Sequence, residues 1–406
     1  MASGIAISRV SNRDRVMSFV VSRPGASRAE IADALGISRS STALTVAELI
    51  GSMRLEERGA TPGGSGAGSG RPTSRLYPVL APGVVLALDF GHKHVAAAVT
   101  DLEGSIIGRR RTDFNVDDDA IGAIDLAAEL VSGILNEKNF SVADLSATVA
   151  SIPGPIDSRS GIVRSPMILS GWVGLDPAEE ISRKIGTEVS VYNDANLGAW
   201  GERMYGAGRE YDDFVYVKAS DGIGAGLVIN GALVHGARGL SGEIGHTPTE
   251  ADALCRCGNS GCIEVVASGA AVRAKLAYTH SGIAPGQSLM SLTDSVSERI
   301  FSEAGRALGK VLADVCNLLN PSALIVGGEL GEVGEPFVGG VRESVDRIAQ
   351  PATAASVRVI PSQLGRHAEI MGAIAMAVEI GREKAARGTT GLPRTESPAN
   401  IGANNH

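Results

Sequence analysis

Three of the four cysteines lie close together in the sequence and could share one metal ion. Cys255, Cys257 and Cys262 fall within eight residues, and His246 lies nine residues before the first of them. Three thiolates and one imidazole form the donor set that zinc takes in closed, tetrahedral structural sites, and such soft ligands do not suit magnesium or calcium. The alternatives are three reduced, unrelated cysteines in a loop, or a disulfide that would leave one cysteine unpaired. The spacing favours a structural zinc site.

A second group of polar residues follows a short apolar run. Val189–Tyr192 is typical of a strand, and Asn193 and Asp194 come directly after it, before a helical stretch. An aspartate at the carboxyl end of a strand can act as a general base or accept a hydrogen bond from a sugar hydroxyl. It can equally cap the following helix, and these residues alone favour the cap.

The segments that must position these residues occur twice in the chain. Strand-like Val84–Leu88 ends in the turn Asp89–Gly91, and two more strand-like runs follow it. Phe214–Ala219 ends in the turn Ser220–Gly224, again with two strand-like runs after it. Two copies of the same order of strands and turns predict a duplicated α/β fold. Glycine-rich turns of this kind expose backbone N–H groups, which can hold phosphate.

Residues 1–80 predict a different structure, a helix-turn-helix. Ser27 and Glu30 have the spacing of a capping box, in which each side chain binds the free backbone N–H group of the other residue. Gly36 and Ile37 then make a short turn before a further helix that runs to about Ile50. Two short helices joined by a glycine-containing turn form a helix-turn-helix.

The second helix of this motif begins with side chains that could reach DNA. It opens with Arg39, Ser40, Ser41 and Thr42. These short or charged groups would meet base edges and phosphates from the N-terminus of a helix in the major groove. Ten arginines, no lysine and six acidic residues give residues 1–80 a net charge of +4, which leaves −12 for the rest of a chain whose total is −8. Such a basic segment predicts polyanion binding, although an ordinary three-helix bundle with solvated arginines is the alternative.

A β-hairpin is expected after these helices. Leu55–Arg58 and Thr73–Tyr77 are the expected strands of a wing, and the Gly- and Ser-rich residues 61–70 between them indicate a mobile loop. Arg71 ends this loop and is placed to touch a phosphate or the minor groove.

Length and composition limit the class of protein. A chain of 406 residues is expected to hold two or three domains, and a hydrophobic fraction of 44% suffices for sizeable cores. The first residues lack the apolar segment of a signal peptide, and there is no run of about 18 uncharged apolar residues that would span a membrane. These features predict a cytoplasmic protein.

These segments together resemble the ROK family, whose name joins repressors, open reading frames and sugar kinases. The resemblance extends over nearly all of residues 10–380. Its most specific part is the pair Gly242–His246 and Cys255–Glu264, which is similar to the zinc signature of the family almost residue for residue. Asn193–Asn196 and Gly239–Glu243 fit as well, and the N-terminal segment resembles the winged helix that only the regulators of the family carry.

The resemblance implies a fold, a ligand and an assembly. The fold is an actin-like (ribonuclease H-like) α/β sugar-kinase body, with two lobes and a sugar cleft between them. The expected domains are an α-rich winged helix-turn-helix in residues 1–80, a first lobe in 84–198 and about 366–385, a second lobe with the zinc site in 199–365, and a disordered tail in 386–406. The implied sugar contacts are Asn193, Asp194, Glu243, His246 and Glu264. Regulators of the family are typically dimers or tetramers that bind palindromic double-stranded DNA.

Both phosphate-binding turns depart from those of the family's kinases. The first turn resembles Asp-x-Gly-Gly-Thr in the kinases, but His92 and Lys93 stand at the second glycine and the threonine here. The second turn is Gly-Thr-Gly in the kinases, and Asp221 replaces its threonine. A carboxylate at about 4 Å from a phosphate repels it by roughly 1–4 kcal/mol per charge pair, which Lys93 would offset in part. Asp194, which matches the family's catalytic base, is retained.

Retained sugar residues and altered phosphate turns predict a regulator and not an enzyme. The hypothesis is a DNA-binding transcription factor, expected to be a repressor of carbohydrate metabolism, that a sugar or sugar derivative controls without being phosphorylated. One alternative is an ATP-dependent sugar kinase of the glucose or N-acetylhexosamine type, with Asp194 as its base. Another is a regulator that responds to protein partners or to a phosphorylated sugar.

Overall fold

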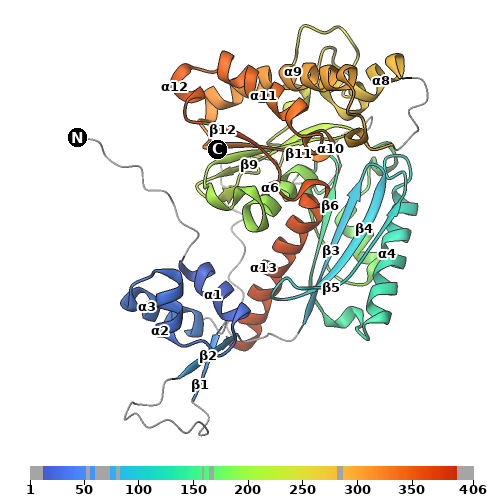
Figure 1. Ribbon diagram of the computed structural model, residues 1–406. Coiled ribbons are helices and arrows are strands. Elements are labelled where there is room, and N and C mark those ends of the chain that lie inside the picture. The colour runs from blue at the N-terminus through green and yellow to red at the C-terminus, as the bar shows by residue number, and fades with distance from the viewer. Residues whose placement is uncertain are drawn as a thin grey trace, which may run out of the picture. The chain divides into compact units, whose positions relative to one another are not determined.

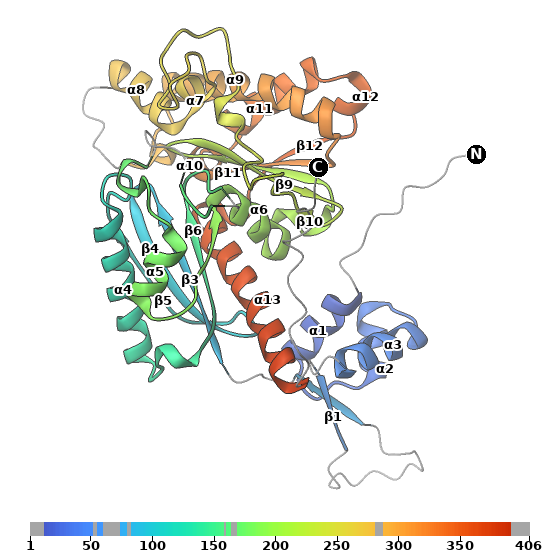
Figure 2. The ribbon, with the colours of Figure 1, turned by 180° about the vertical axis from the view of Figure 1, so that it is seen from behind.

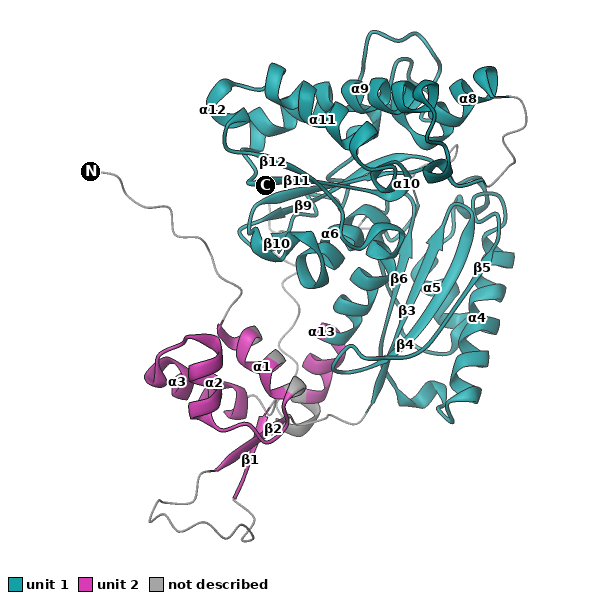
Figure 3. Ribbon diagram, in the orientation of Figure 1, with its two compact units in different colours: residues 1–10, 83–378 teal, residues 11–82, 379–406 magenta. Residues whose placement is uncertain are grey.

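The computed structural model contains two compact units. They are a smaller unit of residues 11–82 and 379–406, and a larger unit of residues 1–10 and 83–378 (Figure 3). The structure describes residues 12–51, 55–59, 74–78, 83–157, 160–163, 169–280 and 287–390. Among these, no helix is both long and apolar enough to cross a membrane. Each unit has a hydrophobic core of its own.

Three helices and a two-stranded hairpin form the described part of residues 11–82 in the smaller unit. The elements are α1 (Asn12–Ser22), α2 (Arg28–Leu35), α3 (Arg39–Gly51), β1 (Leu55–Arg58) and β2 (Arg75–Pro78), and the two strands pair antiparallel. The core contains Val16, Val20, Ile31, Val46, Leu49, Leu55 and Leu76. Because the last two come from the strands, the hairpin closes one side of the helical core.

The turn between α2 and α3 depends on local contacts that the sequence predicts. Ser27 Oγ accepts a hydrogen bond from Glu30 N at 3.3 Å, and the Glu30 carboxylate accepts one from Ser27 N at 2.7 Å. Gly36 follows α2 with a φ of 63°, a conformation that costs glycine little. These contacts make α2 and α3 two helices joined by a tight turn. Arg71 and the Gly- and Ser-rich loop lie outside the described residues.

Two five-stranded sheets of the same design form the larger unit (Figure 1). The first contains β3 (Val84–Gly91), β4 (His94–Asp101), β5 (Ile106–Asp113), β6 (Leu145–Ile152) and β7 (Ser190–Asn193), in the order β5-β4-β3-β6-β7. The second contains β8 (Phe214–Ala219), β9 (Ile223–Ile229), β10 (Ala232–Leu233), β11 (Ala323–Gly327) and β12 (Arg358–Pro361), in the order β10-β9-β8-β11-β12. In both, the central strand pairs antiparallel with the next strand and parallel with its other neighbour. The predicted duplicated, two-lobed α/β fold is confirmed.

Helices cover both faces of the second sheet. α9 (Ser295–Leu319) and α11 (Glu335–Ile348) pack against each other over one face, and α6 (Asp194–Tyr205) packs on β8 and β9 (Figures 1 and 2). The alternation of side chains along β8 explains this arrangement. Val215 and Val217 belong to the core with α9 and α11, whereas Phe214 and Tyr216 belong to a second core with α6.

The remaining helices belong to the larger unit, α13 (Ala368–Thr390) only up to Val378. α4 (Ala120–Glu137) packs against β4 and against α5 (Pro177–Ile185). The shorter helices are α7 (Glu264–Ala267), α8 (Gly269–Thr279), α10 (Gly328–Glu332) and α12 (Pro351–Ala354). α13 approaches α6 closely, since a Cβ on Gly372 would lie 1.8 Å from Leu197 O.

The C-terminal helix is longer than the sequence predicts. α13 continues to Thr390, past residue 386, where a disordered tail is expected. Glutamate, lysine, alanine and arginine dominate residues 382–387, and all of them favour a helix. Residues 391–406 of the expected tail lie outside the described residues.

Candidate functional site

One cleft in the larger unit collects the polar residues that the resemblance singles out. Its volume is about 290 Å³. Its lining includes Asn193, Asp194, Glu243, His246 and Glu264. The turns after β3 and β8 contribute His92, Ser220, Asp221 and Gly222. The five expected sugar contacts therefore line one cleft. The two turns that match the phosphate-binding turns of the family's kinases line the same cleft.

Asn193 and Asp194 reach this cleft from the end of β7 and the start of α6. Asn193 is the helix cap, because its Oδ1 accepts a hydrogen bond from Asn196 N at 3.2 Å. Its Nδ2 donates to Gly154 O at 3.2 Å. Asp194 is the first residue of α6, and its Oδ1 accepts from Ala195 N at 2.7 Å. This leaves the second oxygen of Asp194, Oδ2, for a partner across the cleft.

That partner is Lys218, which no sequence motif indicates. Lys218 Nζ donates to Asp194 Oδ2 at 2.7 Å and lies 3.5 Å from Glu369 Oε1. Lys218 belongs to β8, a strand that is otherwise apolar and aromatic. A lysine inside such a strand is the one sign in the sequence that a buried ion pair is present. Asp194 therefore accepts a hydrogen bond from a buried ammonium group.

Carboxylates of the first lobe surround this ammonium group, which the second lobe contributes. Burial alone lowers the pKa of Lys218, but the charges of Asp194, Glu369 and Asp89 raise this pKa above its ordinary value. Asp89 is itself buried, which raises its pKa, but the charge and hydrogen bond of His94, 2.9 Å away, bring that pKa below its ordinary value. Lys218 is therefore a permanent cation within the cleft at neutral pH.

Glu243 is positioned by the glycine that precedes it. Gly242 has a φ of 93°, and a Cβ there would lie 1.8 Å from Ala225 O, so a larger residue would push the loop away from β9. Burial, together with the charges of Asp194 and Glu264, raises the pKa of Glu243 to about 7. Three carboxyl groups thus share one small cleft, where they can accept hydrogen bonds from several hydroxyl groups of one ligand.

Glu264 and His246 are also held by contacts within the second lobe. Glu264 is the first residue of α7, and its Oε2 accepts a hydrogen bond from Ile223 N at 3.1 Å. His246 Nε2 lies 3.8 Å from Glu243 Oε2. This leaves Nδ1, the other ring nitrogen of His246, directed to a different set of atoms.

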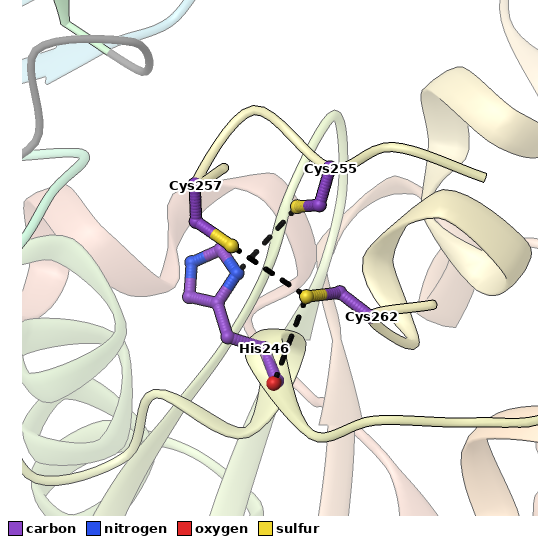
Figure 4. A group of neighbouring side chains, drawn as sticks. All are labelled: His246, Cys255, Cys257 and Cys262. Carbon is purple, nitrogen blue, oxygen red and sulfur yellow. Dashed lines mark hydrogen bonds between the residues drawn. The ribbon is translucent and has the colours of Figure 1, made fainter. Parts of the chain in front are cut away.

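His246 Nδ1 belongs to a cluster with Cys255, Cys257 and Cys262 (Figure 4). One donor atom of each residue lies within 4.8 Å of the other three. Cys257 Sγ is 3.6 Å from Cys262 Sγ, and Cys255 Sγ is 3.7 Å from His246 Nδ1. Donors of a tetrahedral zinc site stand roughly 3.5–3.8 Å apart, given bonds of about 2.3 Å to sulfur and 2.0 Å to nitrogen. The cluster therefore has the spacing and the chemistry to hold a metal ion.

The loop that carries this cluster is tied to the first lobe. Arg256, between two of the cysteines, lies with its guanidinium 3.7 Å from the Asp117 carboxylate. The same carboxylate lies 2.7 Å from His92 Nδ1. A second ion pair joins Arg238 to the buried Asp157. Ion pairs thus connect two loops of the second lobe to the first lobe.

The two turns that correspond to phosphate-binding turns are joined by a further ion pair. Lys93 Nζ, in the turn after β3, donates to the Asp221 carboxylate, in the turn after β8, at 2.9 Å. A Cβ on Gly222 would lie 3.9 Å from His92 Nε2, so the imidazole also reaches the second turn. A polyphosphate between the turns would have to displace Lys93 and would then meet an unpaired carboxylate.

In the smaller unit, α3 exposes fewer of the expected DNA contacts than the sequence predicts. Arg39 and Ser40 are exposed, and Ser41 is half-buried. Thr42 is fully buried, and its hydroxyl donates to a backbone carbonyl one turn earlier at 3.1 Å. Thr42 lies four residues before the core residue Val46 and therefore on the same face of the helix. The interpretation of Thr42 as a DNA contact is wrong.

Known proteins resemble both units of the chain. Residues 85–380 match the ROK family. The xylose repressor of Bacillus spizizenii is 28% identical over 371 residues, which cover 91% of this chain and 95% of the repressor.

Two solved structures have the same fold. A ROK family transcriptional regulator, a homologue of the Escherichia coli Mlc protein, superimposes with a TM-score of 0.69 at 22% identity, over 93% of this chain and 99% of the regulator. The ROK family glucokinase of Streptomyces griseus, in complex with glucose and AMPPNP, has a TM-score of 0.64 at 29% identity, over 73% of this chain and 100% of the kinase. With the family match, the shared fold and the converging cleft residues, this chain belongs to the ROK family.

Proposed function

We propose that this chain is a DNA-binding transcriptional regulator, and a repressor of carbohydrate metabolism, controlled by a sugar or sugar derivative. The smaller unit binds double-stranded DNA as a winged helix-turn-helix. The cleft of the larger unit binds the effector, with contacts from Asn193, Asp194, Glu243, His246 and Glu264. The cleft holds this ligand without phosphorylating it, so the protein is not an enzyme.

The ion pair between Lys218 and Asp194 carries this proposal. A sugar kinase needs a carboxylate that can accept the proton of the attacking hydroxyl group. Here Asp194 Oδ2 accepts a hydrogen bond from a buried ammonium group at 2.7 Å, so protonation of Asp194 would break a buried ion pair. The Lys93–Asp221 pair is a second obstacle, at the place where phosphates would lie. A sugar can bind to Asp194 as a hydrogen-bond donor with both pairs intact.

The extent of the similarities supports the regulatory part of the proposal. The glucokinase of Streptomyces griseus is matched along its whole length by 73% of this chain. The xylose repressor matches 91% of this chain, so at least part of the smaller unit is shared with a repressor and not with the kinase. Exposed Arg39 and Ser40 at the start of α3, and Arg71 of the wing, are the DNA contacts that we assign to this unit.

The regulator acts as a homodimer or homotetramer on a palindromic operator. A two-fold symmetric assembly places two α3 helices on two half-sites. A sugar that prefers the closed cleft shifts the population of the assembly toward that state and so alters the spacing of the two DNA-binding units. Coupling of this kind is typically about 1–3 kcal/mol, or roughly 5- to 150-fold in DNA affinity.

The metal of the His246 cluster is zinc, and its role is structural. Four protein donors complete a tetrahedral site and leave no position for a substrate. A zinc ion bound to His246 Nδ1 would fix the ring, while Nε2 faces Glu243 across 3.8 Å. The metal would thus orient two sugar contacts and perform no chemistry of its own.

A gel-shift experiment with promoter DNA that contains palindromic sites tests the proposal. The full-length protein should bind one such site specifically, and one sugar from a thermal-shift screen of sugars and sugar phosphates should change the affinity. An effector found only among sugar phosphates would limit the ligand to that class. The absence of sequence-specific binding under every sugar condition would refute the proposal.

The alternative is an ATP-dependent sugar kinase of the glucose or N-acetylhexosamine type. The similarity of the larger unit to a glucokinase and the retained Asp194 favour it. Purified protein with ATP, magnesium and a panel of hexoses decides between the two. Turnover that disappears in an Asp194→Asn variant would establish the kinase and overturn our proposal.

A further inference from the structure

An apolar strip lies in the middle of the exposed face of α3. The side chain of Leu44 is 68% exposed, and Ala43 and Ala47 are exposed beside it. Residues three and four positions apart are neighbours on one side of a helix, so Ala47 lies beside both Ala43 and Leu44. Val46 and Leu49 lie on the opposite side, in the core of the smaller unit. α3 therefore buries one apolar face and presents a second one to its surroundings.

The N-terminal end of this strip is polar and basic. Arg39 and Ser40 occupy the first turn of α3 and are exposed. Arg39 forms no ion pair with any residue in the part of the chain that the structure describes. The N-terminus of a helix also carries a partial positive charge. A partner for this face must therefore offer anionic groups next to apolar ones.

The major groove of DNA offers this combination. Phosphates line both of its edges, and the C5-methyl of thymine is the apolar group that the base edges expose within it. A helix in the groove directs the residues of its first turns to the bases. Leu44 stands one turn after Ser40, on the same face. In a helix docked in this way, a leucine at this point would face base edges and not the phosphate backbone.

We propose that Leu44, together with Ala43 and Ala47, recognises thymine in each half-site of the operator. This inference rests on the proposed DNA binding and adds the base that is recognised. The thymine methyl packs against the Leu44 side chain, which removes both from water. Arg39 and Ser40 bind the neighbouring phosphates or base edges, so the half-site contains an A·T pair adjacent to those contacts.

Replacement of thymine by uracil tests this assignment, because uracil lacks only the methyl group. Selection from randomised duplex DNA with the full-length protein first identifies the preferred half-site. Each thymine is then changed to uracil, and the affinity is measured by fluorescence anisotropy. At one position in the half-site, uracil should lower the affinity about fourfold, which is the effect of about 0.8 kcal/mol for one buried methyl-sized group.

Two variants show whether Leu44 is the residue that contacts the methyl group. In Leu44→Ala, the uracil penalty at that position should disappear. The fold is not at risk, since Leu44 is exposed and alanine favours a helix. Leu318→Ala is the matched control, because Leu318 is 82% exposed on α9 of the larger unit. This variant should keep the full penalty.

Three outcomes would overturn the inference. Equal affinity of the wild type for thymine and uracil at every position would exclude methyl recognition. An unchanged penalty in Leu44→Ala would assign the methyl group to another side chain. A selection that returns no preferred sequence would refute the proposed DNA binding itself, and the inference with it.

Discussion

Replacing Lys218 by methionine should strongly destabilise the larger unit. Methionine has a similar length but lacks the ammonium group that Asp194 and Glu369 bind. The side chains of the three residues are 14%, 10% and 6% exposed, so water cannot replace the lost cation. Removing one partner of a buried ion pair costs about 3–5 kcal/mol. For a unit of this size, the melting temperature should fall by on the order of 10 °C.

Denaturation followed by tryptophan fluorescence measures this loss, because both tryptophans, Trp172 and Trp200, belong to the larger unit. The pKa of Lys218 is raised in the folded chain. The stabilisation is therefore complete below an unfolded-state pKa of about 10.4 and is lost only as the pH rises above it. Measurement at pH 7 thus records the full effect. Lys310→Met, at an exposed position on α9, is the matched control and should stay within about 0.5 kcal/mol of the wild type.

A double-mutant cycle with Asp194→Asn shows whether the two residues interact directly. In the Lys218→Met background, Asp194→Asn should lower the free energy of unfolding much less than it does in the wild type. The reason is that it then removes a buried carboxylate that has already lost its counter-ion. The expected coupling energy is about 0.5–3 kcal/mol. Additivity within about 0.5 kcal/mol, or a loss below about 1 kcal/mol for Lys218→Met, would refute the view that Asp194 is held in a buried ion pair.

Three further predictions concern the metal cluster, the cleft loop and the smaller unit. Cys257→Ser should lose zinc, sugar response and regulated DNA binding together. The control is Cys316→Ser, at a buried cysteine outside the cluster, which should keep its metal in elemental analysis. Loss of the metal with a normal sugar response would contradict this prediction. Gly242→Ala should abolish the sugar-induced thermal shift. The control Gly258→Ala, at a glycine with a similar φ but no atom within 4 Å of its added Cβ, should retain this shift. Equal behaviour of the two variants would exclude the close approach of position 242 to Ala225 O as the cause. Ser27→Ala should destabilise the smaller unit by about 1 kcal/mol through loss of the cap, as measured by circular dichroism during denaturation, and no change would show that the capping box contributes nothing.

Features that depend on neighbours in the sequence could be predicted. The capping box of Ser27 and Glu30 and the turn at Gly36 involve residues within one or two helical turns, so their types and spacing are sufficient. The same holds for Cys255, Cys257 and Cys262, whose short separations keep their thiols close together. The duplicated strand and turn order was also visible, because each copy repeats its apolar periodicity.

Contacts between distant segments could not be predicted in the same way. Lys218 and Asp194 are 24 residues apart, and Lys93 and Asp221 are 128 residues apart. The sequence did suggest that Lys93 offsets the charge of Asp221, but the contact depends on how the two sheets face each other. Thr42 is a different case. Its position in the helical repeat of Val46 and Leu49 places it in the core, and its polar type led to the wrong assignment.

The DNA affinity of the full-length protein, measured while each sugar is added in the absence of ATP, tests the central claim most directly. Fluorescence anisotropy with the selected duplex provides this measurement. Our account predicts that one sugar changes the affinity at least about fivefold, and that Glu243→Gln and Glu264→Gln weaken this response while basal DNA binding persists. An affinity that no sugar changes, together with a sugar phosphate that forms when ATP is present, would contradict it.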